Sequence, residues 1–239
     1  MTSVRARVER IPVHPSVWGS GVAMTTTSAS SPISNLWSFD FTAPYPTQDS
    51  DFLRQLSFVP GLKEMLMLRQ VHALEHATVW VLSNAATPMG SSRFPAIPAR
   101  DNDRLGGLST DQGFYLYGQA NTAQLRYAVR SALQRLTQGE WDLAVHPRCG
   151  TNWSVNLLVT AGLALGAHLL LPRNPIEQIF GLGIAATAAA QLAPNLGSLA
   201  QRYLTTSIPF NLEIEEITQK ADGWGRSAHF VRVRWKDLQ

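Results

Sequence analysis

Cysteine is almost absent from this chain, with Cys149 alone among 239 residues. A single cysteine excludes a framework of intrachain disulfides. Charge is also scarce, because Asp, Glu, Lys and Arg make up only 15% of the residues, against about 25% in an average soluble domain. That deficit indicates an unusual share of buried or lipid-facing surface. The formal net charge is only +3, and the basic residues are scattered without interleaved aromatics, so nucleic acid is not an expected partner.

The first 35 residues contain no apolar run of signal-peptide length. Residues 1–35 are rich in Ser, Thr, Pro and Gly, with Arg5, Arg7 and Arg10 near the start. We expect a disordered N-terminal tail, or an upstream start with Met24 as an alternative. A targeting leader is the other interpretation.

The segment Leu62–Leu82 lacks both Gly and Pro and is rich in Leu, Met, Ala and Val, which predicts a helix. It is apolar nearly all round, which indicates burial. Its polar exceptions lie three or four residues apart, so they form one narrow stripe on the helix. They are Arg69, His72, Glu75 and His76.

Within this stripe, His72 and His76 stand one helical turn apart, at a spacing that lets two imidazoles hold one metal ion. Glu75 leans toward the same face. The order His-x-x-Glu-His is that of the inverted zincins, in which two His bind zinc and the Glu takes a proton from zinc-bound water. Zinc lowers the pKa of that water to about 7. Two core histidines satisfied by hydrogen bonds, with Glu75 paired to Arg69, or a haem held by histidine, are the alternatives.

A second motif, His146-Pro147-Arg148-Cys149-Gly150, offers another imidazole and the thiol in a tight turn. If His72, His76, His146 and Cys149 all bind, the site is four-coordinate and closed, which is typical of structural zinc. If only three bind, a water takes the fourth position and Glu75 has a catalytic role. We favour the open site. Glu140 is a spare candidate ligand, and a Cys149 nucleophile activated by histidine is a further alternative.

Two apolar runs follow, Trp153–Leu171 and Ile176–Leu192, separated by Pro172-Arg173-Asn174-Pro175. Each is near the ~20 residues that span a bilayer, and their Gly and Ala content favours close helix packing. We expect a transmembrane hairpin, with a buried hairpin in a soluble core as the alternative. Arginines flank the pair but only Arg173 lies in the turn, so both motifs are expected on the cytoplasmic side.

The remaining pattern predicts an α+β fold with membrane helices, a buried metal-binding helix and a small antiparallel sheet. We expect an aromatic strap over 37–60 ending in a short helix at 51–56, a loop over 84–108, and a helix over 123–136 capped by Thr122. Strands are expected at 113–118 and 141–145, and a C-terminal β-hairpin near 212–217 and 230–235 is expected to pair with the first of them. The predicted regions are 1–35 (tail), 36–152 (metal site), 153–194 (membrane hairpin) and 195–239 (β-hairpin completing the cytoplasmic domain).

The motifs His-Ala-Leu-Glu-His-Ala (72–77) and His-Pro-Arg-Cys-Gly-Thr-Asn (146–152) resemble those of an uncharacterised membrane-protein family common in photosynthetic bacteria. They are also similar to a wider bacterial family of unknown function, with His-Gly-Ala-Glu-His and His-Pro-Arg-Cys-Gly-Thr before membrane helices. The likeness runs from about Gln70 to the hairpin and includes Gly-Phe-Tyr-Leu-Tyr-Gly (113–118). It implies a metal-dependent enzyme without naming a reaction.

The sequence therefore predicts a membrane-anchored zinc hydrolase in which Glu75 is the general base. The alternative is a non-catalytic, zinc-stabilised scaffold or assembly factor, with protein partners in a membrane complex. In either case an integral protein of the plasma or thylakoid membrane is expected.

Overall fold

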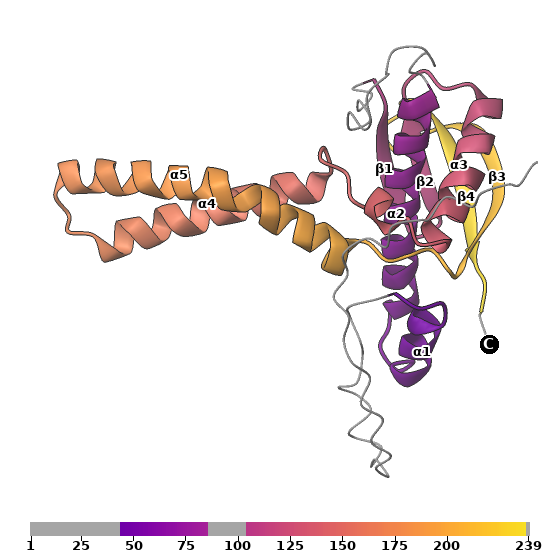
Figure 1. Cartoon of the computed structure of the whole chain (residues 1–239), viewed down its shortest axis with the longest axis horizontal. Helices are drawn as coiled ribbons and strands as arrows, with labels where there is room; N and C mark the ends of the chain where they lie inside the picture. The colour runs from indigo at the N-terminus through magenta and orange to yellow at the C-terminus, as the bar shows by residue number, and fades with distance from the viewer. Residues whose placement is uncertain (1–43, 86–103, 238–239) are drawn as a thin grey trace, which may run out of the picture. The chain divides into compact units, whose positions relative to one another are not determined.

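The computed structural model describes residues 44–85 and 104–237 (Figure 1). The predictions for the tail 1–35, for the first part of the aromatic strap and for most of the 84–108 loop lie outside these residues. The elements in chain order are α1 (Gln48–Gln55), α2 (Leu62–Ala85), β1 (Gly106–Thr110), β2 (Gly113–Tyr117), α3 (Thr122–Thr137), η2 (Trp141–Ala144), α4 (Gly150–Leu170), α5 (Pro175–Ala200), η3 (Gln201–Thr205), β3 (Leu212–Ala221) and β4 (Ser227–Trp235).

The four strands form one antiparallel sheet in the order β1-β2-β4-β3. Helices α2 and α3 pack together beside it (Figure 1). The core consists of the inward apolar residues of these helices and strands, among them Leu74, Val129, Phe114 and Val231, each 0% exposed. The α+β class with a small antiparallel sheet is thus confirmed, as is the pairing of the C-terminal hairpin with β2.

Three local predictions were wrong. The N-cap of α3 is Asn121, whose side chain accepts a hydrogen bond from Ala123 N, and Thr122 is the first residue of the helix. Residues 141–145 do not form a strand: η2 is a 3₁₀ turn, closed by hydrogen bonds from Leu143 N to Glu140 O and from Val145 N to Asp142 O. The predicted 84–108 loop ends in a strand, because β1 pairs along its whole length with β2. The strand could not be predicted from its residues because it begins with two glycines, Gly106 and Gly107, which are rare inside strands. Its conformation is set by its pairing with β2.

The apolar runs form two long helices that lie side by side as an antiparallel pair (Figure 1). Every fourth residue of α5 is small and buried in the contact: Gly181, Ala185, Ala189, Ala193 and Gly197. Such a stripe lets two helix backbones approach closely. A Cβ added at Gly181 would lie 2.0 Å from Leu171 Cδ1, which shows how close the contact is.

The outer faces of this pair are apolar and open. Leu158, Leu170 and Phe180 are 71%, 86% and 72% exposed, whereas a soluble protein rarely exposes a large contiguous apolar patch. The segments Gly150–Leu170 and Pro175–Thr205 are long and apolar enough to cross a membrane, with mean hydropathies of 1.5 and 1.3. The boundaries predicted for the four regions stay a prediction.

Candidate metal centre

His72, His76 and Cys149 come together around one point although 73 positions separate the second histidine from the cysteine in the sequence. One ligand atom from each lies within 4.8 Å of the others, and Cys149 Sγ is 3.2 Å from His72 Nε2. Zinc bonds of about 2.0–2.3 Å in a tetrahedron place ligand atoms roughly 3.3–3.6 Å apart. The cluster therefore has the size and the donor types of a site that could hold a metal ion.

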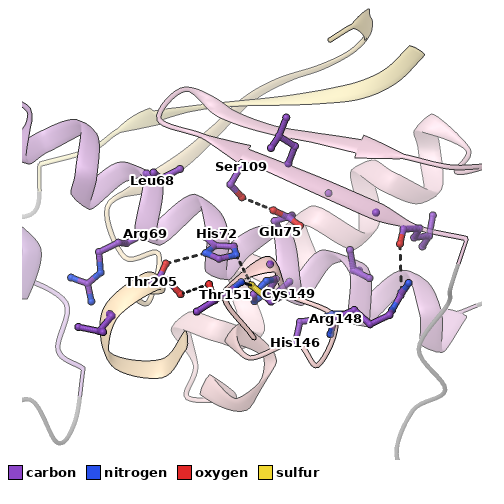
Figure 2. Close-up of a pocket in the computed structure, with 18 of the residues that line it drawn as sticks. Leu68, Arg69, His72, Glu75, Ser109, His146, Arg148, Cys149, Thr151 and Thr205 are labelled. Atoms are coloured by element: carbon purple, nitrogen blue, oxygen red, sulfur yellow. Dashed lines mark hydrogen bonds between the residues drawn. The ribbon is translucent and has the colours of Figure 1, made fainter. Parts of the chain in front are cut away.

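Both imidazoles are oriented by backbone carbonyls, and Figure 2 shows the pairing of His72 with Thr205. His72 Nδ1 lies 3.1 Å from Thr205 O, and His76 Nδ1 lies 2.7 Å from Ala144 O. A carbonyl only accepts, so Nδ1 is the donor in each ring. Metal-binding histidines in proteins are commonly held in this way. The structure thus leaves Nε2 as the ring nitrogen of each histidine that could bind a cation.

Cys149 is fixed by the start of α4. It is the N-cap of that helix, and its Sγ accepts a hydrogen bond from Thr151 N at 3.4 Å. Burial raises the pKa of the Cys149 thiol, but the His76 imidazole and the Thr151 N–H favour the thiolate more strongly, so the net shift is downward. The thiolate is the form that binds metal.

A buried glutamine holds the loop that carries Cys149. Gln201, 0% exposed, accepts a hydrogen bond from His146 N at 2.8 Å and donates one to Asn152 Oδ1 at 2.7 Å. Asn152 in turn donates to Pro147 O at 2.8 Å. Gln201 opens η3, a single π-helical turn between α5 and the sheet, and such turns are frequent at functional sites.

Glu75 is a buried carboxylate on the same helix. Its Oε2 accepts a 2.5 Å hydrogen bond from Ser109 Oγ on β1 (Figure 2). A Cβ at Gly107 would lie 2.0 Å from Glu75 Oε1, so a larger residue at this position would displace the carboxylate. Burial raises the pKa of Glu75, while the Ser109 hydrogen bond and nearby His72 oppose that rise.

The alternative pairing of Glu75 with Arg69 is not what the structure has. The Arg69 guanidinium donates to Tyr203 O at 3.2 Å and to Thr206 O at 3.0 Å. Arg69 therefore ties α2 to the segment after α5.

His146 lies beside the cluster without joining it. Its ring centroid is 5.6 Å from that of His76 and 4.9 Å from that of Trp80, and its Nδ1 accepts from Arg148 N at 3.3 Å. Among the described residues, the group whose ligand atoms meet consists of His72, His76 and Cys149. The spare candidate Glu140 lies outside it, in a salt bridge with Arg135 on the surface.

The triad, His146 and Glu75 line one cavity of about 650 Å³ (Figure 2). Its walls come from α2, from β1 and from the segments that enter α4 and leave α5. Sequence reasoning missed Ser109, Thr205 and Gly107, which orient or accommodate the polar groups. None belongs to a motif; Gly107 alone gave a signal, as part of a Gly-Gly pair.

Comparison with known proteins gives a family but no activity. Residues 67–217 match a family model described as "Domain of unknown function (DUF6391)". An uncharacterized protein of Picosynechococcus sp. (strain ATCC 27264 / PCC 7002 / PR-6) is 51% identical over 203 residues, which cover 85% of this chain and 97% of that protein. No solved structure matches the chain.

Proposed function

Since the chain belongs to this family of unknown function, we propose from its own residues that it is a membrane-anchored, metal-dependent hydrolase. His72, His76 and Cys149 hold the metal ion, which we take to be zinc, and Glu75 is the general base. The observation that carries the proposal is that the cluster of two oriented imidazoles and a thiol lines the same cavity as a buried carboxylate. A site made only to hold metal has no need of that carboxylate.

His72, His76 and Cys149 would supply three ligands to the ion, the number that catalytic zinc sites take from the protein. His146 is the remaining candidate for a fourth ligand. Its ring lies tilted against that of Trp80, with the centroids 4.9 Å apart, and contributes no atom to the cluster. The cavity supplies space for water and substrate at the fourth position. These features support the open site over the closed one.

Each side chain then has a defined task. A bound zinc ion would supply Lewis-acid activation of water and of a carbonyl group at neutral pH. The Ser109 hydroxyl holds Oε2 of Glu75, which leaves Oε1 to take a proton from the attacking water and return it to the leaving group. Thr205 O and Ala144 O fix the orientation of the two imidazole rings by their hydrogen bonds to Nδ1.

The α4–α5 pair serves as the membrane anchor in this proposal. Its apolar outer face is exposed over two bilayer-length helices, and lipid is the surrounding that such a surface requires. Arginines on the flanks, such as Arg130 and Arg202, support a cytoplasmic position for the cavity by the positive-inside rule. The membrane is the plasma or the thylakoid membrane.

The experiment compares Glu75→Gln with Glu140→Gln in the detergent-solubilised full chain. Elemental analysis measures the bound metal, and a panel of chromogenic esters and amides measures hydrolysis. Glu75→Gln should keep its metal and lose activity by a factor of about 10²–10⁴, the usual contribution of a general base. Glu140→Gln is the matched control, because Glu140 lies on the surface in a salt bridge outside the cavity. Full activity in Glu75→Gln refutes the catalytic role.

One observation favours a second function, a non-catalytic scaffold. Cys149 is the N-cap of α4, whereas both histidines lie on α2. A metal at this point would clamp the metal-site domain to the anchor. In a non-catalytic scaffold or assembly factor of a membrane complex, Glu75→Gln would be neutral and loss of the metal would weaken the fold. The same variant therefore separates the two functions.

A further inference from the structure

The cavity changes character along α2. Met65, Leu68, His72, His76 and Val79 line it at helical spacing. Toward the start of the helix the exposed lining is apolar, with Met65 49% and Leu68 41% exposed. Arg69 also lines this part, and its guanidinium donates to Tyr203 O and Thr206 O. At the ligand positions the lining is polar and closed, and His76 is only 3% exposed. A ligand thus meets an apolar mouth first and the metal ligands last.

The mouth also adjoins the anchor. Gly150 and Thr151 begin the first membrane-length segment, Leu204 and Thr205 end the second, and all four line the cavity. Leu204 is 71% exposed. If the helix pair crosses the bilayer, the cavity lies where the pair leaves it. Its apolar mouth is then continuous with lipid and not with water.

We propose that the substrate is an acyl lipid of the bilayer, bound with its chain against Met65, Leu68 and Leu204 and its carbonyl group at the metal ligands. This inference rests on the proposed function and adds its substrate class. A cavity of about 650 Å³ is in the ordinary range of about 300–1,000 Å³ for sites that bind one small molecule. It accommodates the carbonyl end and part of one chain, with the rest of the lipid remaining in the membrane.

Acyl hydroxamates of increasing chain length test the proposed lipid substrate. The hydroxamate group binds the metal, and the dependence of affinity on chain length measures contact of the chain with the apolar mouth. The probes are acetohydroxamate, octanohydroxamate and dodecanohydroxamate, titrated into the Co²⁺-loaded full chain in one detergent. The cobalt absorption spectrum gives affinity without any activity. Each buried methylene is worth about fourfold in affinity, so burial of three or four gives octanohydroxamate an advantage of about 100-fold over acetohydroxamate.

Leu68→Ala should reduce that advantage about fivefold and leave acetohydroxamate binding unchanged. Leu204→Ala is a second variant on the other wall and should do the same. Tyr127→Ala is the control, since Tyr127 is 71% exposed on α3 and does not line the cavity. All variants share one detergent, so partition of the long probes into micelles cancels in the comparison.

The possible results distinguish a failure of the lipid substrate from a failure of the proposed hydrolase function. Equal affinity for all chain lengths, or a chain-length advantage that both leucine variants keep, overturns the lipid substrate while leaving the metal site intact. Tighter binding of a leucyl-leucine hydroxamate than of octanohydroxamate overturns it in favour of a polypeptide. If acetohydroxamate leaves the cobalt spectrum unchanged, the open metal site is wrong, and the inference fails with it.

Discussion

Replacing Cys149 by serine separates two tasks of one side chain. The thiol caps α4 by accepting from Thr151 N, and it completes the cluster with His72 and His76. Serine is a better N-cap than most residues but a poor zinc ligand. Cys149→Ser should therefore keep the metal-free fold and lose metal affinity.

The size of the loss follows from ligand number. Structural zinc is bound with about 10–16 kcal/mol shared among four ligands, so one ligand contributes about 2.5–4 kcal/mol. At 1.4 kcal/mol for each factor of ten, the affinity should fall about 100- to 1,000-fold. Cys149→Ala removes the cap as well, and its metal-free form should be less stable than that of Cys149→Ser by about 0.5–2 kcal/mol.

Zinc competition with a chelator measures the affinity, and Co²⁺ substitution identifies the ligand. Cys149 is the one cysteine of the chain, so a thiolate-to-cobalt charge-transfer band in the wild-type protein can come from no other residue. The band should vanish in Cys149→Ser. A wild-type cobalt protein without the band, or a serine variant with wild-type zinc affinity, refutes the thiolate as a ligand.

Three further predictions use the surroundings of the cluster. Gly107→Ala should lower hydrolysis about 100-fold at unchanged zinc content, because the new Cβ would displace Glu75 by about 1 Å; Gly106→Ala, whose Cβ meets nothing within 4 Å, is the activity control. Gln201→Leu removes two hydrogen bonds that hold the cysteine loop, and zinc titration should show affinity about 10- to 100-fold lower. In metal-free protein the lowered pKa of Cys149 places its thiolate at lower pH than in free cysteine; iodoacetamide labelling should rise with pH through that lowered pKa, and zinc should protect.

Periodicity predicted the elements whose residues carry their own pattern. Helix α2 lacks Gly and Pro, so both its extent and its polar stripe could be predicted from sequence. The strand β4 alternates clearly, β3 does so with some irregularity, and β2 is a short run of aromatic and apolar residues between glycines. The predicted pairing of the hairpin with β2 is confirmed. In contrast, β1 starts with two glycines and depends on its partner strand, and η2 is four residues stabilised by local turns. The sequence did not predict β1 and η2, because contacts with other parts of the chain or local turns set their conformation.

The site divides in the same way. The spacing of His72 and His76 is a property of one helix, so their joint placement could be predicted. The approach of Cys149 was predicted from its chemistry, and the structure does bring it to the pair. His146 was predicted as a ligand from the same motif, but it is not part of the cluster, and its Nδ1 accepts a hydrogen bond from Arg148 N within its own loop. Thr205 O, a backbone atom 133 positions from His72, leaves no mark in a sequence at all.

The two proposed functions share most of the geometry and differ over Glu75. A clamp needs His72, His76 and Cys149 to join α2 to α4, and the contacts of α2 with η3 would strengthen that joint whether or not the protein is an enzyme. A clamp gains nothing from a carboxylate that is 8% exposed, since burying such a group costs free energy unless it is well paired. One hydroxyl, from Ser109, is its hydrogen-bond partner. A strand with glycine at 107 makes room for it. A catalytic role for Glu75 would account for the free-energy cost of burying its carboxylate, and a scaffold role would not.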